Sequence, residues 1–143
     1  MITGPTSGAR LSETTDALDA RLLAHGVRPT RHRRELARLL LDGRDRHVTA
    51  EQVFQEAAAA GTGMVLATVY NTLHQLSEAG LLAERVLAPG RVIYDTNTSD
   101  HWHTLDEATG EVRDLPAGEV RGLPDDLDVT RVEVVVRVRG RRG

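Results

Sequence analysis

The chain has 143 residues and a formal net charge of −3, so its length allows one ordinary domain or two small ones. This charge gives no overall basic signature, and any contact with nucleic acid must therefore come from a local patch. Cysteine is absent, which excludes disulfides and thiolate metal sites and leaves imidazole and carboxylate as the strong ligands. No apolar run approaches the length of a membrane span and no signal-peptide pattern begins the chain, so we expect a cytoplasmic protein.

The first half of the chain is predicted to be mainly helical. Residues 1–11 are rich in Gly, Ser, Thr and Pro and are expected to form a disordered tail. A first helix is predicted to begin at Ser12 and to end at Gly26. Thr30 and Thr49 are good N-caps for two further helices. These two helices are predicted to run to about residue 41 and about residue 60.

A fourth, central helix precedes Gly80, which is typical of a C-cap in the left-handed region. Val69, Leu73 and Leu76 recur at helical spacing and would form its buried face. Tyr70 and Asn71 fall on the opposite face. In a DNA major groove, Asn can make two hydrogen bonds to an adenine edge and an aromatic ring can pack on a thymine methyl. The periodicity alone is equally compatible with a helix that turns a few polar residues to water.

Two short strands around Pro89-Gly90, over residues 81–88 and 91–95, indicate a two-stranded wing. Three helices followed by a wing form the winged-helix variant of helix-turn-helix architecture, in which the central helix enters the major groove. We therefore predict a winged-helix DNA-binding domain over residues 12–95.

The remaining residues, 96–143, are predicted to form a small α/β domain, which makes the fold class α+β. Strands are expected over 101–105, 111–115 and 131–139, and the last alternates Val with other residues. The polar segment 117–128 could accommodate one short helix.

A basic patch lies around the second helix. Five arginines fall within eleven residues that contain a single acid, Glu35: Arg28, Arg31, Arg33, Arg34 and Arg38. Such a patch is the electrostatic footprint of nucleic-acid binding, although a solvated cationic face has the same composition.

The segment Ala67-Thr68-Val69-Tyr70-Asn71-Thr72-Leu73, followed by Gly80-Leu81-Leu82, closely resembles the recognition helix of the ferric uptake regulator family. The resemblance extends from about Leu22 to Arg139. It implies a metal-responsive transcription factor that binds double-stranded promoter DNA as a homodimer paired through the small domain. One departure is Val65, which stands where the family usually has a capping Ser, so we expect a weaker helix start.

The resemblance also implies DNA-contacting residues. Arg28 and Arg33 match family positions that touch the DNA backbone or the minor groove. The recognition-helix contacts would come from Thr68, Tyr70 and Asn71.

His101 and His103 form a His-x-His pair. On a strand both would project to one face, roughly 7 Å apart, so one metal ion can use both. The resemblance implies a regulatory site made of three imidazoles and two carboxylates: His47, Asp95, His101, His103 and Asp114. This set suits Fe(II) or Mn(II), and also Zn(II). Because its members come from both halves of the chain, a bound metal would fix the angle between the halves.

The chain departs from many family members at Asp106 and Thr109, which stand where a Cys-x-x-Cys pair holds a structural zinc. This zinc is therefore not expected. In its lack of cysteine and in segments 45–51, 95–98 and 134–139, the chain is most similar to the iron response regulator branch. This similarity implies haem binding near His101 and His103. Trp102 replaces the middle residue of that branch's three histidines, and the resulting Asp-His-aromatic-His order is similar to the peroxide-sensing branch. The effector therefore stays open between haem, a divalent metal and peroxide.

Two other classes of function compete with a regulator. A small metalloenzyme would need an open coordination position and a nearby general base, for which the sequence offers no further Glu/His pair at convincing spacing. A winged helix could also serve as a protein-interaction module. We expect a regulator without enzymatic activity.

Overall fold

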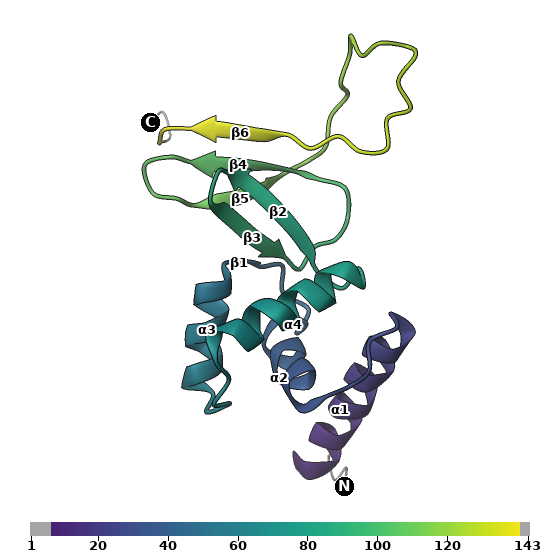
Figure 1. Ribbon diagram of the computed structural model, residues 1–143, viewed down its shortest axis with the longest axis vertical. Coiled ribbons are helices and arrows are strands. Elements are labelled where there is room, and N and C mark those ends of the chain that lie inside the picture. The colour runs from purple at the N-terminus through teal and green to yellow at the C-terminus, as the bar shows by residue number, and fades with distance from the viewer. Residues whose placement is uncertain (1–6, 141–143) are drawn as a thin grey trace, which may run out of the picture. The chain divides into compact units, whose positions relative to one another are not determined.

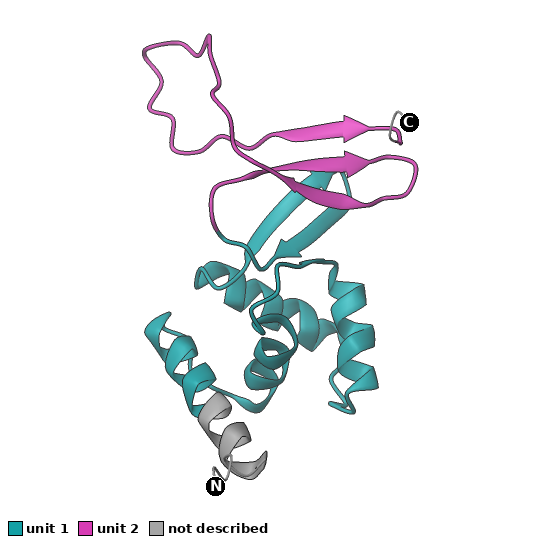
Figure 2. Ribbon diagram, turned by 180° about the vertical axis from the view of Figure 1, so that it is seen from behind, with its two compact units in different colours: residues 1–98 teal, residues 99–143 magenta. Residues whose placement is uncertain are grey.

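The computed structural model describes the backbone of residues 7–140 and the side chains of residues 16–140. The chain forms two compact units, residues 1–98 and residues 99–143 (Figure 2). The sequence placed this boundary after Asp95. Among the described residues, no helix has the length and apolar character needed to cross a bilayer.

The first unit contains the four predicted helices, which are labelled in Figure 1: α1 Ser7–Ala24, α2 Arg31–Leu40, α3 Ala50–Ala59 and α4 Leu66–Glu78. Helix α1 begins at Ser7 and not at Ser12, so the prediction of a disordered segment was wrong for residues 7–11. No proline follows Pro5 in this stretch, so nothing blocks the backbone hydrogen bonds of the helix. The rest of the predicted tail, residues 1–6, lies outside the described residues.

Local capping sets where these helices start. The Thr30 hydroxyl accepts from the Arg33 backbone N–H, and Thr49 and Gln52 form a reciprocal capping box at α3. Val65 is the N-cap of α4 and provides no side-chain hydrogen bond, as its apolar side chain predicts. Gly80 closes α4 with a φ of +83°, a conformation that glycine adopts without strain.

The core of the first unit lies between the helices, and most of its members are leucine or valine. Its fully buried apolar side chains include Leu22, Leu36, Leu40, Val53, Val69, Leu73 and Leu76. Helix α4 packs against both α2 and α3 and thereby buries one face, which leaves its other face exposed.

A three-stranded sheet completes the first unit, with the strand order β1-β3-β2. The wing strands are β2 (Ala83–Ala88) and β3 (Arg91–Asp95), close to the predicted bounds. The sequence did not predict β1 (His47–Val48), which pairs antiparallel with β3. Two residues are too few to show an alternating pattern.

The second unit is a three-stranded sheet with the order β5-β4-β6. Strand β4 (Trp102–Asp106) pairs antiparallel with β5 (Val112–Leu115) and parallel with β6 (Val135–Val138). Strand β6 is shorter than predicted, although the Val134 carbonyl just before it also accepts from the His103 N–H of β4 at 3.1 Å. The helix considered for residues 117–128 is absent from this described segment, where two prolines and two glycines fall between residues 116 and 124.

Candidate functional site

The exposed face of α4 carries the residues predicted to contact DNA. Tyr70 is 42% exposed and Asn71 is also exposed, while Thr68 is half-buried near the start of the helix. Val69 and Leu73 are fully buried on the opposite face and fix the rotation of the helix about its axis. The predicted division of α4 into a core face and a polar face is confirmed.

The Tyr70 side chain is held by a neighbouring helix. Its hydroxyl donates a hydrogen bond to Oε1 of Glu51, in the first turn of α3. This hydrogen bond lowers the pKa of Glu51 and raises the pKa of Tyr70, so both groups keep their charge states at neutral pH. The sequence did not identify Glu51 as part of this surface, since a Glu in the first turn of a helix has an ordinary explanation in the helix dipole.

Arg33 lies where α2 meets α4. Its Nε donates to Oε1 of Gln75 at 3.0 Å, and its Nη1 donates to the Arg28 carbonyl at 2.9 Å. The guanidinium is therefore positioned by both the recognition helix and the segment before α2. Arg28 itself is exposed.

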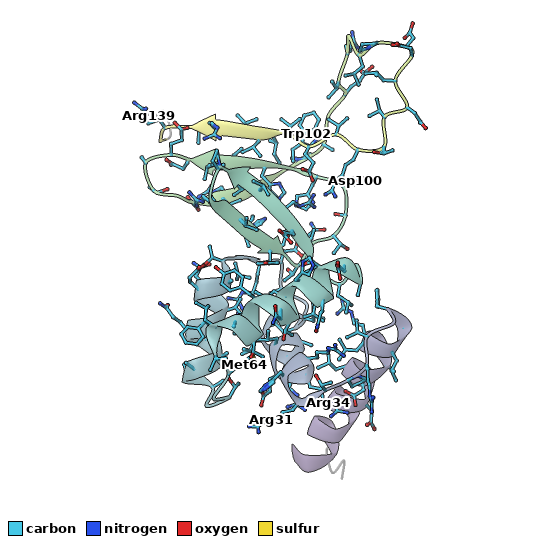
Figure 3. The ribbon with its side chains drawn as sticks, viewed as in Figure 1. Arg31, Arg34, Met64, Asp100, Trp102 and Arg139 are labelled. Carbon is cyan, nitrogen blue, oxygen red and sulfur yellow. The ribbon has the colours of Figure 1, made fainter. Side chains whose placement is uncertain are left out.

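Other arginines of the basic patch are engaged within the first unit. Arg34 makes a bidentate pair with Asp19 of α1, with distances of 2.9 and 3.0 Å, and Arg31 pairs with Glu35 at 3.1 Å. The side chains of Arg31 and Arg34 are labelled in Figure 3. The hydrogen bond from Arg34 lowers the pKa of Asp19. The patch is therefore less available to an external anion than the arginine count predicts.

Two of the predicted metal ligands lie on the sheet of the first unit. His47 of β1 and Asp95 of β3 are paired directly across the sheet, and Nε2 of His47 lies 3.4 Å from Oδ2 of Asp95. Asp95 is fully buried, and its Oδ1 accepts from the Asn97 backbone N–H at 2.9 Å.

The second unit brings the other three predicted ligands together. His103 of β4 is paired with Asp114 of β5, and His101 lies immediately before the first residue of β4. Oδ1 of Asp114 lies 3.1 Å from Nε2 of His101 and 3.7 Å from Nε2 of His103. The two imidazole rings have centroids 4.5 Å apart.

The chemistry of these donors fits a divalent metal. Neighbouring ligands on an ion with bonds of about 2.1 Å are separated by roughly 3.0–3.4 Å, close to the distances observed here. Nδ1 of His101 lies 2.7 Å from the Ser99 carbonyl, which can only accept, so this nitrogen carries the proton. In a neutral ring the Nε2 lone pair then faces a carboxylate oxygen, and a cation between the two acceptors would stabilise the pair.

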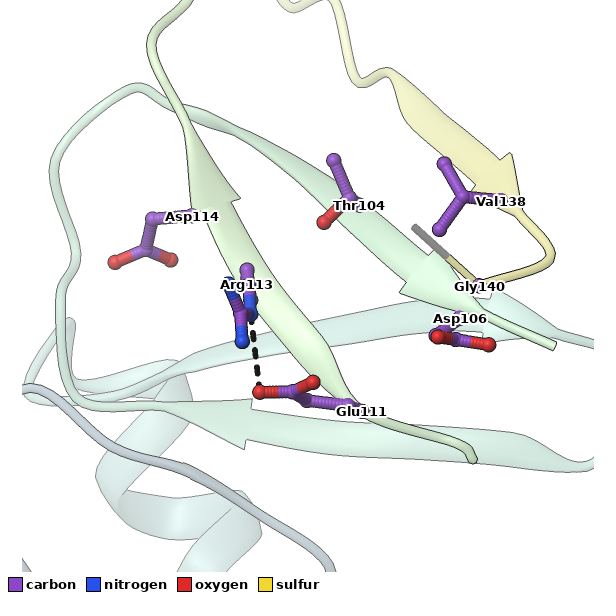
Figure 4. A pocket seen from close by; sticks show the side chains of 7 residues that line it. All are labelled: Thr104, Asp106, Glu111, Arg113, Asp114, Val138 and Gly140. Carbon is purple, nitrogen blue, oxygen red and sulfur yellow. Dashed lines mark hydrogen bonds and ion pairs between the residues drawn. The ribbon is translucent and has the colours of Figure 1, made fainter. Parts of the chain in front are cut away.

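A shallow pocket of about 300 Å³ in the second unit is lined by seven residues, of which Asp106, Glu111, Arg113 and Asp114 are charged (Figure 4). Arg113 donates to Glu111 at 3.0 Å, and Asp106 accepts backbone N–H groups of the following turn, at 2.9 Å from Ala108. These contacts account for Arg113, Glu111 and Asp106, and Asp114 faces the two histidines.

The first unit therefore has the helix-turn-helix and wing of a DNA-binding protein, and both units carry His and Asp donors suited to a divalent metal. The ferric uptake regulator family model matches residues 24–132. The chain belongs to this family, whose members are metal-responsive transcription regulators and not enzymes.

Individual relatives agree with this assignment. The chain is 28% identical over 118 residues to a ferric uptake regulation protein of Rhizobium leguminosarum, with 82% of each chain covered. It is 30% identical over 123 residues to a peroxide-responsive repressor of Staphylococcus epidermidis, covering 80% of this chain and 81% of the relative. The structure of a ferric uptake regulator from Pseudomonas aeruginosa with manganese matches with a TM-score of 0.69 and 26% identity, covering 87% of this chain and 98% of the other.

Proposed function

We propose that this protein is a homodimeric regulator that binds promoter DNA through α4 and responds to a divalent metal held by His47, Asp95, His101, His103 and Asp114. The observation that carries the proposal is the convergence of three donors in the second unit. Nε2 of both histidines approaches one oxygen of Asp114, and Nδ1 of His101 is committed to a backbone carbonyl. Metal-binding histidines commonly donate their other N–H in this way.

DNA binding is supported by the surface of the first unit. Asn71 is exposed on α4 and can pair with an adenine edge, and the ring of Tyr70 can contact a thymine methyl. Thr68, near the helix start, can contact the same groove edge. Arg28 and Arg33 would contact phosphates, which give affinity without sequence preference.

The metal would act by joining the two units. Each unit supplies only part of the ligand set, two residues from the first and three from the second. A metal ion that takes ligands from both units favours the conformations in which all five can reach it, and this population shift would alter the spacing of the two recognition helices in a dimer.

We infer that the effector is a divalent ion. Both imidazoles direct Nε2 at one carboxylate oxygen and His103 is buried, so neither ring is directed at a separate porphyrin iron. A peroxide-responsive or manganese-dependent repressor is as compatible with the donor set as an iron regulator. Haem, which the similarity to the iron response regulator branch implies, is the alternative effector.

The proposal is tested by anaerobic fluorescence anisotropy on the protein's own promoter region. Chelator-treated protein is compared with protein given Mn(II), Fe(II) or haem. We expect divalent metal to change DNA affinity in the wild type and not in a variant that combines His101→Ala and His103→Ala. His25→Ala is the control, since this exposed histidine lies outside the ligand set. A double variant that still responds to the metal would refute the site, and release by haem alone would favour the haem alternative.

A further inference from the structure

Strand β2 carries a reversal of the usual burial pattern. Alternate residues of a strand point to opposite faces, and here Arg85 and Leu87 point inward while Glu84 and Val86 point to solvent. Arg85 is 5% exposed, whereas the apolar side chain next to it, Val86, is 63% exposed. Arginine is almost never fully buried without a partner of opposite charge.

One charged group beside Arg85 is the buried carboxylate of Asp95. Nε of Arg85 lies 3.8 Å from Oδ2 of Asp95, and both side chains are almost inaccessible to solvent. The register explains the contact. Ala83 pairs with Asp95 and Arg85 with Ile93, so Arg85 and Asp95 are diagonal neighbours on one face of the sheet. The same oxygen also faces His47 from the other side.

This arrangement gives Asp95 a cationic partner that does not depend on a metal. Burial of an unpaired charge is costly, and a carboxylate and a guanidinium that are buried together compensate one another. A divalent ion that binds Asp95 must share the carboxylate with Arg85. It must also accept a buried positive charge close by, where the low local dielectric strengthens the repulsion.

We propose that Arg85 is a positioning residue that holds Asp95 in place and lowers the affinity of the metal site. This inference rests on the proposed role of Asp95 as a metal ligand. The guanidinium raises the metal concentration at which the site fills, because the metal must compete with Arg85 for the carboxylate of Asp95. A site without Arg85 would fill at lower metal concentration. The sequence contained a signal for this role, since Arg85 is a charged residue in step with Leu87 on a predicted strand.

The test is Mn(II) affinity measured by competition with a fluorescent chelator on the full-length protein. Arg85→Gln removes the charge and keeps a hydrogen-bond donor, Arg85→Met removes both, and Arg85→Lys keeps the charge. We expect the first two variants to bind Mn(II) about tenfold more tightly or better, and the Lys variant to stay near the wild type. Arg91→Gln on β3 is the matched control for loss of an arginine from the same sheet.

Folding of each variant is checked by circular dichroism, and Arg85→Gln carries the test if Arg85→Met does not fold. Unchanged or weaker binding in a folded Arg85→Gln protein overturns the proposal, as does tighter binding by Arg85→Lys equal to that of Arg85→Gln. Asp95→Asn separates this result from the metal site itself. If Asp95→Asn binds Mn(II) as the wild type does, the proposed site is wrong. If Asp95→Asn loses Mn(II) binding while Arg85→Gln binds Mn(II) with wild-type affinity, only the role of Arg85 is refuted.

Discussion

The hydroxyl of Tyr70 donates to the carboxylate of Glu51, so the recognition helix is joined to the first turn of α3 on the surface proposed to face DNA. Because this hydroxyl is already engaged, the part of Tyr70 left to contact DNA is its ring. We therefore expect the Tyr70 ring to contact thymine methyl groups and the groove surface, while its hydroxyl stays hydrogen-bonded to Glu51.

The first prediction separates the ring from the hydroxyl. Tyr70→Ala should weaken promoter binding by about tenfold through loss of contact with a thymine methyl, while Tyr70→Phe should stay within about threefold of the wild type. Anisotropy with DNA in which uracil replaces thymine measures the same contact from the other side. If Tyr70→Phe loses as much affinity as Tyr70→Ala, the hydroxyl contacts DNA directly and the role of Glu51 is different.

A second prediction concerns Arg33. Arg33→Ala should weaken binding to specific and non-specific DNA by similar factors and reduce the slope of log affinity against log salt by about 1, as expected for one lost phosphate contact. Arg31→Ala is the control, because its charge is paired with Glu35. Equal losses in the two variants would mean that total charge, and not the position of Arg33, determines binding.

The pH dependence of stability follows from the pair between Asp19 and Arg34. Because the pKa of Asp19 is lowered in the folded protein, the pair stabilises the fold above the unfolded pKa of about 3.8. This contribution is lost as the pH falls through the folded pKa. Asp19→Asn should therefore lower the urea midpoint at pH 7 and have little effect near pH 2. A deficit that is equal at both pH values would contradict the assignment.

The uncapped start of α4 provides a prediction of increased stability. Val65 has the extended conformation of an N-cap, with φ −84° and ψ 158°, and its side chain is 62% exposed. Val65→Ser should supply the missing acceptor and raise the free energy of unfolding by about 1 kcal/mol. Val65→Ala removes the same side chain without adding a cap and should give no such gain. Urea unfolding of the three proteins measures the difference.

The sequence predicted the helical part of this fold well, because caps such as Thr30 and Thr49 and the apolar spacing of α4 are local signals. It could not predict β1, whose two residues form a strand only because β3 lies beside them. The segment 117–128 was difficult for a related reason, since its polar composition is compatible with a helix or with irregular structure.

In the candidate site, too, local patterns predicted some features, while others depend on contacts between residues far apart in the sequence. The His-x-His pattern predicted that His101 and His103 lie on one face, and Nε2 of both approaches one oxygen of Asp114, although His101 lies just before β4. The roles inferred for Glu51 and Arg85 depend on residues from other elements, Tyr70 and Asp95. A burial pattern can indicate that Arg85 faces inward, but it does not identify which carboxylate lies opposite.

The residue just before β1, Arg46, is hydrogen-bonded to the segment through which the chain leaves the first unit. Just after β3, the Thr96 backbone N–H donates to the Arg46 carbonyl at 3.0 Å, and the Arg46 N–H donates to the Thr96 hydroxyl at 2.8 Å. These bonds join residues fifty positions apart, immediately before the boundary at residue 98. A force applied at that boundary would therefore be transmitted to the segment between α2 and α3 as well as to the wing. The helices that carry the surface proposed to contact DNA would therefore respond to motion of the second unit.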